Sequence, residues 1–507
     1  MTLAVVMSRA LDGLMAPEVH VEVQLANGLP SFMLVGLADT EVKEARERVR
    51  AALQQSGFNF PHNKRITVSL APADLPKESG RFDLAIALGI LAAMGLVDET
   101  RLAGCEFAGE LSLAGELRPV RGALALALAA HREGSGRTLV LPESSAREAA
   151  RVAGLKVCGA RTLLDVVASL QAGDAAVPLG AAQAGPLPQV SAGPDLQDVQ
   201  GQAAAKRALE IAAAGAHSLL LVGPPGTGKS MLAQRLPGLL PAMDETEALA
   251  AAALQGLQTQ SGDALAFGER PVRAPHHTAS AVALAGGGSP PRPGEISLAH
   301  GGVLFLDEMP EFPRSALEAL REPLETGRIT ISRAARQATF PARFQLVAAM
   351  NPCACGWLGA PLASGRACRC TPEAVARYQG RLSGPLLDRI DLQVEVLAAS
   401  PAELLGAPLG ETTAQVAARV AEARARQGWR QGAPNGQLEA ADIARHCLMD
   451  DSAQAFLKSA AERRMWSGRR LHRCLKVART VADLAGIDRI GTAHLAEALQ
   501  LQRVLQR

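Results

Sequence analysis

The clearest chemical pattern in the chain is a glycine-rich stretch between an apolar run and a helix-like segment. It fits G-x-x-x-x-G-K-[ST], in which backbone N–H groups surround a phosphate and the following helix adds its N-terminal dipole. Lys229 would reach the β- and γ-phosphates, and Ser230 would hold Mg²⁺. The sequence therefore predicts an ATP-binding loop made of Gly223, Pro224, Pro225, Gly226, Thr227, Gly228, Lys229 and Ser230.

Two more apolar runs end in polar side chains suited to the same chemistry. Val303–Leu306 is followed by Asp307, which would bind Mg²⁺ through water, and by Glu308, which would polarise the attacking water. The run 344–350 ends in Asn351, whose amide would orient that water beside Glu308. An Asn-Pro pair alone is a turn signal, so the role of Asn351 depends on the other two motifs.

An arginine near the end of this region has two interpretations. Arg389 would reach the γ-phosphate of a neighbouring subunit as an arginine finger, which raises rates by about 10³–10⁵-fold where measured. Alternatively, it forms a surface salt bridge with Asp388 or Asp391.

Half of the eight cysteines fall within one short segment. Cys353, Cys355, Cys368 and Cys370 form two C-x-C pairs, which favour a tetrahedral Zn²⁺ site in a reducing compartment. The alternative is four reduced thiols in a loop. The other four cysteines are isolated along the chain, as is typical of core residues: Cys105, Cys158, Cys447 and Cys474.

Two segments between the nucleotide motifs predict surface features. Residues 327–341 alternate like a β-hairpin, and Arg328, Arg333 and Arg336 would follow a phosphate backbone if this hairpin binds DNA. The alternative is a solvated hairpin with ordinary surface arginines. The segment 273–293 predicts an exposed loop. Its His276 and His277 have no partner at metal-ligand spacing.

Composition bounds the cellular setting. The net charge of the 507 residues is only +2, so any nucleic-acid surface must be local. No signal peptide is visible, and the longest apolar run, Leu84–Val97, is too short to span a bilayer and suits a buried helix. We therefore expect a cytoplasmic protein with no membrane contact and with reduced or metal-bound cysteines.

The elements that must position these residues fall into four regions. Residues 1–172 alternate strand and helix patterns, with an amphipathic helix at 40–57 that turns Ala45, Val49, Ala52 and Leu53 to one side. Residues 173–194 predict a flexible linker rich in Ala, Gly and Pro. Residues 195–400 predict an α/β domain with a parallel sheet. Residues 401–507 predict helices, broken at Gly468 and Gly486.

Taken together, these motifs resemble the YifB/ComM family of magnesium-chelatase-like AAA+ ATPases over nearly the whole chain. The resemblance rests on the ATP-binding loop, 198–202, 206–210, 294–300, 306–308, 351–356 and 383–391. It implies an AAA+ core with a helix-2 insertion, a pre-sensor-1 hairpin and a helical lid. It also implies subunits that assemble into a ring, taken as a homohexamer, with ATP and Mg²⁺ bound between them.

The resemblance assigns roles to residues already singled out. It implies that Asn351 is sensor 1 and that Arg389 is the arginine finger. It places the sensor 2 arginine within 466–471, where Arg469 is the choice and Arg470 and Arg473 remain open. Whether Arg469 acts on its own subunit's nucleotide or on a neighbour's is also open.

The N-terminal region resembles the proteolytic domain of Lon at 75–80, 109–124 and 138–142. Lon's nucleophile falls near Arg81, with Ser79 two places off, and its lysine falls near Leu124. Because a serine without a nearby base is a weak nucleophile, we expect a Lon-like fold without protease chemistry.

Three function classes follow. The family resemblance implies a DNA motor that moves branched recombination intermediates during natural transformation. A chelatase-type motor that remodels a protein partner is the alternative, although such subunits are not expected to carry the Lon-like domain or the cysteine cluster. A Lon-type protease is disfavoured by the missing dyad.

Overall fold

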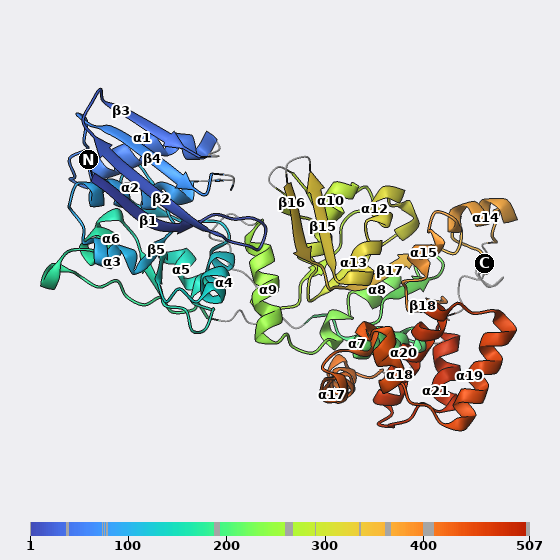
Figure 1. Cartoon of the computed structure of the whole chain (residues 1–507). Coiled ribbons are helices and arrows are strands. Elements are labelled where there is room, and N and C mark those ends of the chain that lie inside the picture. The colour runs from blue at the N-terminus through green and yellow to red at the C-terminus, as the bar shows by residue number, and fades with distance from the viewer. Residues whose placement is uncertain are drawn as a thin grey trace.

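The computed structural model describes residues 2–36, 40–73, 75, 77, 80–186, 193–258, 267–288, 291–333, 336–359, 367–398 and 410–502. The side chains of residues 40–43, 333, 336 and 464 lie outside the description. Figure 1 shows two α/β domains side by side and a helical domain packed below the second. The overall class is the mixed α/β fold that the sequence predicts.

The N-terminal domain is built on a seven-stranded mixed sheet in the order β3-β4-β2-β1-β5-β8-β9. Parallel pairing joins β1, β5, β8 and β9, whereas β1–β2 and β2–β4 are antiparallel. Its strands are β1 (Thr2–Arg9), β2 (Glu18–Ala26), β3 (Ser31–Val35), β4 (Arg65–Ala71), β5 (Cys105–Phe107), β8 (Thr138–Pro142) and β9 (Val157–Ala160), with a small β6 (Glu110–Leu111)–β7 (Leu117–Arg118) hairpin.

The helices of this domain pack by their apolar sides. The predicted side of α1 is buried, with Ala45, Val49, Ala52 and Leu53 each at most 1% exposed, and every residue of α2 is buried. The buried helix expected over Leu84–Val97 ends earlier, at Ala93. The helices are α1 (Thr40–Gln55), α2 (Asp83–Ala93), α3 (Glu99–Ala103), α4 (Ala123–Glu133), α5 (Glu143–Ala149) and α6 (Leu163–Ser169).

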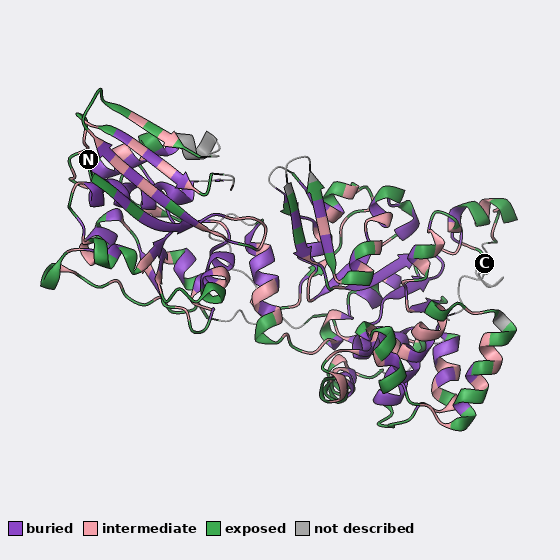
Figure 2. Ribbon diagram, in the orientation of Figure 1, coloured by how far each residue is buried: buried purple, intermediate pink, exposed green. Residues whose placement is uncertain are grey.

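The second domain is built on a five-stranded parallel sheet in the order β11-β14-β17-β10-β18. Its strands are short and almost entirely buried, as Figure 2 shows, which explains why they are continuously apolar in sequence. They are β10 (Leu219–Val222), β11 (Val272–Arg273), β14 (Val303–Leu306), β17 (Gln345–Met350) and β18 (Leu392–Glu395).

Helices and two short ribbons surround this sheet. The predicted hairpin is present, since Arg328 pairs with Pro341 and Arg333 with Arg336 in antiparallel register. The elements are α7 (Ala203–Gly215), α8 (Lys229–Ala233), α9 (Glu245–Gly256), α10 (Ala281–Ala285), β12 (Gly286–Gly287), β13 (Arg292–Pro293), α11 (Glu295–Leu298), α12 (Arg314–Glu318), α13 (Arg321–Thr326), β15 (Arg328–Arg333), β16 (Arg336–Pro341), α14 (Pro372–Gln379) and α15 (Gly384–Leu387).

The C-terminal domain is helical, and its helices are interrupted beside the two predicted glycines, between Arg464 and Gly468 and between Leu484 and Thr492. Gly468 does not interrupt a helix. It begins one, because the Ser467 side chain accepts the N–H of Arg470 as an N-cap. The preceding helix ends at Met465, which has left-handed backbone with φ 45°. The helices are α17 (Thr413–Gln431), α18 (Ala440–His446), α19 (Asp451–Arg464), α20 (Gly468–Leu484) and α21 (Thr492–Gln500).

This helical domain is tied to the ATPase sheet through one histidine. His217, fully buried just before β10, bonds the Thr480 hydroxyl of α20 at 2.8 Å and the Asp391 carboxylate at 3.2 Å. Arg424 of α17 also donates to the carbonyl of Ala213 at the end of α7. The lid therefore packs directly on the sheet that carries the nucleotide motifs.

The N-terminal domain contacts the core through α9, which Figure 1 shows between the two domains. Leu124 and Leu126 of α4 share an apolar cluster with Ala252 and Ala253 of α9. The N–H of Gly122 also donates to the carbonyl of Gly256 at 3.1 Å. This seam places the N-terminal domain beside the core.

The predicted linker is partly attached to the N-terminal domain. The N–H of Val177 donates to Ala168, and the N–H of Ala182 donates to Val157. Residues 187–192 lie outside the described residues, as does the predicted boundary between core and lid at residue 400. Among the helices of the described chain, none is long and apolar enough to cross a membrane.

Candidate nucleotide site

The predicted nucleotide residues gather at the carboxyl ends of three neighbouring strands. β10 leads into the glycine loop, β14 into Asp307 and Glu308, and β17 into Asn351. The strands pair as β14–β17–β10, so their ends meet at one edge of the sheet. In open parallel sheets, ligands bind at this edge.

Lys229 lies inside the loop that it follows. Its ammonium donates to the carbonyls of Gly223 at 2.7 Å and Pro224 at 2.8 Å, and to Asn351 Oδ1 at 3.1 Å. Burial lowers the pKa of Lys229, and the nearby carboxylates of Asp307 and Glu308 oppose that shift. The structure thus brings the lysine and the predicted sensor 1 amide into direct contact.

The glycines of the loop are required by its geometry. A Cβ on Gly223 would lie 2.1 Å from the carbonyl oxygen of Val396, so any side chain there would push the loop away from the strand next to it. Gly226 and Gly228 have φ of 78° and 88°, in the left-handed region that favours glycine. Gln202 donates to the carbonyl of Thr227, a contact that motif analysis did not foresee.

Oxygen ligands suited to Mg²⁺ converge beside the loop. The hydroxyl of Ser230 donates to Asp307 Oδ2 at 2.6 Å, and the other carboxylate oxygen, Oδ1, accepts the N–H of Glu308. A hydroxyl and a carboxylate from adjacent elements form the kind of partial shell by which Mg²⁺ is held in nucleotide sites. The residues therefore fit the ion that the ATPase family requires.

Glu308 has a partner that the sequence did not predict. Its backbone is left-handed with φ 50°, and its side chain is 56% exposed. His277 Nδ1 lies 3.4 Å from Glu308 Oε2. The neighbouring His276, whose ring centroid lies 4.1 Å from that of His277, bonds Thr278 instead. His277 comes from the loop after β11, so the inserted segment touches the predicted catalytic carboxylate.

The predicted finger and sensor 2 arginines share one carboxylate. Arg389 Nη2 pairs with Glu325 Oε2, and Arg469 Nη2 lies 2.8 Å from Glu325 Oε1. Arg389 therefore pairs with neither Asp388 nor Asp391 through its side chain, because Asp391 bonds His217 and the N–H of Ser218. Glu325 on α13 had no signal in the sequence.

The two remaining sensor 2 candidates are engaged elsewhere. Arg473 donates to the carbonyls of Leu387 and Ile390, which tether α20 to the segment around Arg389. The Arg470 guanidinium lies 5.3 Å from the centroid of the Trp466 ring. Arg469, whose side chain is 62% exposed, is therefore the freest of the three to reach a nucleotide.

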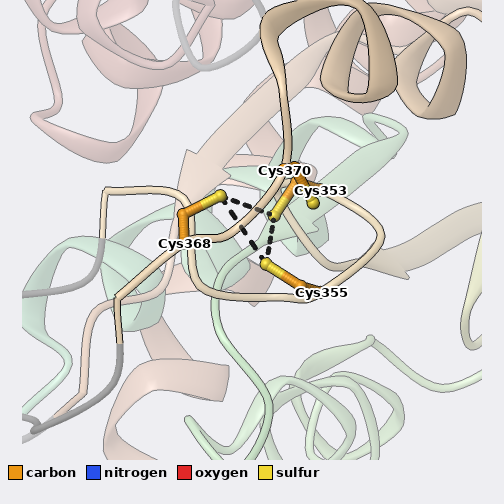
Figure 3. A group of neighbouring side chains, drawn as sticks. All are labelled: Cys353, Cys355, Cys368 and Cys370. Carbon is orange, nitrogen blue, oxygen red and sulfur yellow. Dashed lines mark hydrogen bonds between the residues drawn. The ribbon is translucent and has the colours of Figure 1, made fainter.

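The four clustered cysteines come together in space. All four Sγ atoms lie within 4.8 Å of one another, and none is in a disulfide (Figure 3). Among the described residues, this is the one group of three or more His, Cys, Asp or Glu side chains close enough to share a metal ion. The arrangement is compatible with a structural zinc site.

The hairpin arginines are only partly described. Arg328, at the base of the hairpin, is exposed. The backbones of Arg333 and Arg336 pair at the tip, but their side chains lie outside the described residues. Figure 1 shows the hairpin projecting from the core beside the N-terminal domain.

The N-terminal domain has no hydrolytic arrangement at the positions that match Lon. Arg81 and Leu124 stand there, and both are buried. Ser79 lies outside the described residues. Lys77 is fully buried and donates to the carbonyl of Pro72.

The parallel sheet, the glycine loop and the carboxylates after β14 define this protein as a P-loop ATPase of the AAA+ class. Three family models match the chain. "Magnesium chelatase, subunit ChlI" covers residues 195–404, "Subunit ChlI of Mg-chelatase" covers 21–145, and "Magnesium chelatase, subunit ChlI C-terminal" covers 410–502.

Similar proteins extend over the full length. The chain is 49% identical to Competence protein ComM of Haemophilus influenzae, over 100% of this chain and 99% of that protein. It is 46% identical to Uncharacterized protein YifB of Salmonella typhimurium over 99% of the chain and 98% of the relative. It is 44% identical to Uncharacterized protein Rv2897c of Mycobacterium tuberculosis over 99% of each. The chain belongs to the YifB/ComM family of magnesium-chelatase-like AAA+ ATPases.

The N-terminal domain was expected to separate this chain from chelatase subunits. The model that matches residues 21–145 is itself named for a chelatase subunit. That domain therefore does not discriminate between the two candidate functions.

Proposed function

We propose that this ATPase is a ring-forming DNA motor that drives branch migration of recombination intermediates, and that it serves natural transformation. The name of the Haemophilus influenzae relative, a competence protein, supports the role in transformation. The observation that carries the motor is the split of its hydrolytic residues into two groups. Lys229, Ser230 and Asp307 contact one another or Asn351, whereas Arg389 and Arg469 share Glu325.

Each residue of the first group has a defined task, and so does Glu308, which follows Asp307. Lys229 binds the β- and γ-phosphates in place of the carbonyls it now contacts, and the loop N–H groups surround them. Glu308 takes the proton of the attacking water, and Asn351 orients that water. Mg²⁺, held by Ser230 and Asp307, neutralises phosphate charge when it is bound.

The second group supports assembly into a ring. Arg389 and Arg469 both pair with the carboxylate of Glu325 and so place two positive charges together. Within the described residues, neither arginine contacts the ATP-binding loop of its own chain. We propose that both reach the nucleotide of a neighbouring subunit, where they stabilise charge in the transition state. Nucleotide binding then favours assembly, and a closed ring, taken as a hexamer, follows from the repeated head-to-tail contact.

The DNA would be contacted by the β15–β16 hairpin through Arg328, Arg333 and Arg336. A projecting ribbon with basic residues along it can follow a phosphate backbone. Charge reversal of Arg333 and Arg336 should weaken DNA binding and leave basal ATPase intact. The same reversal at Arg489, exposed on the lid, is the matched control. Undiminished DNA affinity in the hairpin variant would refute this contact.

A chelatase-type motor that remodels a protein is the second candidate. The descriptions of all three matching families support it. A Lon-type protease is disfavoured, since buried Arg81 and Leu124 occupy the positions that match the Lon dyad. For either motor we propose a cytoplasmic location.

The deciding experiment measures ATP hydrolysis with no DNA, single strands, duplex and a four-way junction, and scores junction movement in the same tubes. The DNA motor predicts stimulated hydrolysis and junction movement. Both should disappear in Glu308→Gln, which should still bind ATP and assemble. A basal rate that no DNA changes would refute the DNA motor and favour remodelling of a protein partner.

A further inference from the structure

The cysteine cluster has the dimensions of an occupied metal site. The Sγ atoms of Cys353, Cys355 and Cys368 are separated by 3.4, 3.7 and 3.6 Å. Tetrahedral zinc with Zn–S bonds of about 2.3 Å requires S···S separations of about 3.8 Å. A disulfide would require about 2.05 Å. These three sulfurs therefore surround a point at bonding distance for zinc, and the Sγ of Cys370 lies within 4.8 Å of each of them.

Backbone N–H groups point at three of the sulfurs. The Sγ of Cys355 accepts the N–H groups of Trp357 and Arg369. The N–H of Cys370 points to Cys368, and the N–H of Cys355 points to Cys370. Backbone N–H donors around cysteine sulfurs form the outer shell that orients such ligands in metal sites.

The first cysteine pair lies in a turn pressed against the ATP-binding loop. Gly356 has φ 84°, and a Cβ there would lie 2.7 Å from Pro225 Cδ and 3.9 Å from Asn351 Cγ. The N–H of Gly356 bonds the carbonyl of Cys353, closing the turn. The same turn follows Asn351, whose amide oxygen contacts Lys229. Its position therefore affects two residues of the nucleotide site.

The second pair ties the turn to the next part of the chain. Cys368 and Cys370 come just before Thr371, which caps α14, and that helix leads to α15 and Arg389. Gln379 of α14 donates to the carbonyl of Pro352 at 2.9 Å. The backbone of Asn351 also bonds the Tyr378 side chain of the same helix. The cysteine sulfurs join the two segments at a further point.

We propose that Cys353, Cys355, Cys368 and Cys370 bind one Zn²⁺ ion, and that this ion holds the Asn351–Gly356 turn against Pro225 of the ATP-binding loop. Zinc binding is independent of the proposed function, whereas its effect on turnover rests on the ATPase site described above. Closed four-thiolate sites are structural, so the ion stabilises the turn and takes no part in the chemistry.

Elemental analysis of full-length protein purified without chelator should find about one zinc per chain. A mercurial that displaces thiolate-bound metal should release it to a colorimetric zinc indicator. Zinc near zero in protein that still binds ATP would overturn the proposal. This test needs no DNA, so its failure is distinct from failure of the DNA motor.

The double variant C368S/C370S should lose the zinc, and Cys105→Ser, outside the cluster, should keep it. Without the ion the turn that contacts Pro225 and follows Asn351 is released. We therefore expect about tenfold weaker binding of a fluorescent ATP analogue, equivalent to about 1.4 kcal/mol. Circular dichroism checks that the variant is folded. If the variant is unfolded, the zinc content of the wild-type protein still tests whether the site binds zinc. Zinc retained by C368S/C370S would refute the ligand set. Zinc loss with unchanged ATP affinity would refute the clamp.

Discussion

Each α/β domain of this protein contains a buried lysine. Lys229 in the ATPase core is 9% exposed, and Lys77 in the N-terminal domain is 0% exposed. Both donate to backbone carbonyls, Lys229 to Gly223 and Pro224 and Lys77 to Pro72. Burial of an ammonium is costly unless hydrogen bonds compensate, so both sites provide such bonds.

The two lysines differ in what surrounds them. Lys229 follows a glycine loop and lies near the carboxylates of Asp307 and Glu308, at the edge of the sheet where a ligand can enter. In the N-terminal domain, the position that matches the Lon nucleophile, four residues after Lys77, holds buried Arg81. A buried lysine is therefore chemically useful only where neighbouring groups form a site for a ligand. In the N-terminal domain, buried charges instead contribute to the fold.

The largest effect is expected on ATP affinity, when the buried lysine of the ATPase core is replaced. Lys229→Met removes the ammonium that would bind phosphate, which should cost about 2–5 kcal/mol, or at least about thirtyfold in ATP affinity. Lys77→Met is the matched control and should leave ATP affinity unchanged in protein that is folded. Titration with a fluorescent ATP analogue measures both. Equal losses in the two variants would contradict the distinction between the domains.

The next effect concerns the buried charges of the N-terminal domain. Arg9, 1% exposed, bonds Glu106 at 2.6 Å, Glu133 at 2.7 Å and the carbonyl of Ala16. Arg9→Met leaves buried Glu106 without its closest cation, and breaking a buried pair typically costs about 3–5 kcal/mol. Calorimetry should show a lower melting temperature for the unfolding transition of the N-terminal domain, which is the transition that added ATP does not shift. Arg118→Met, at an exposed pair with Glu110, is the control and should change little.

The two domains should also respond to pH in opposite directions. Burial raises the pKa of Asp83 from 3.8 to about 6, although Arg48 opposes the shift. Its contribution to stability is therefore present below pH 3.8 and lost as the pH rises through 6. In the core, burial and the nearby charge of Arg343 lower the pKa of His300 from 6.5 to about 4. That contribution is present above pH 6.5 and lost as the pH falls through 4.

Asp83→Asn and His300→Gln separate these contributions. Each variant should flatten the pH dependence of one calorimetric transition between pH 4 and 6.5, by at most about 3 kcal/mol at 1.36 kcal/mol per pKa unit. Bound ATP identifies the core transition, because a ligand stabilises the domain that binds it. If His300→Gln altered the transition that is insensitive to ATP, the assignment would be wrong.

The smallest effect is expected at Glu325. Its ion pairs with Arg389 and Arg469 involve a half-exposed carboxylate, and such pairs contribute about 1 kcal/mol or less. Glu325→Gln should therefore change kcat by no more than about fivefold and leave ATP affinity unchanged. Glu322→Gln on the same helix is the control. A loss of ATP affinity in Glu325→Gln would mean that these arginines act on the nucleotide of their own subunit.

The sequence predicted much of the secondary structure, because the burial of a strand or helix shows in the pattern of its own apolar residues. The strand Val303–Leu306 occurs with the predicted bounds, since a buried parallel strand must be continuously apolar. The amphipathic side of α1 is likewise buried as predicted. The break predicted at Gly468 occurs just before that glycine, where the left-handed turn at Met465 ends one helix and the N-cap at Ser467 begins the next.

By itself the sequence determined which residues can bind ligands or take part in catalysis: the ATP-binding loop, the carboxylates after β14 and the clustered cysteines. Within each motif these residues are close together in the sequence, so their spacing can be recognised without the structure. Only the tertiary structure decided that Asn351 contacts Lys229, that His277 meets Glu308 and that Glu325 joins Arg389 to Arg469. These partners are far apart in sequence, and packing of the sheet, insertions and lid brings them together.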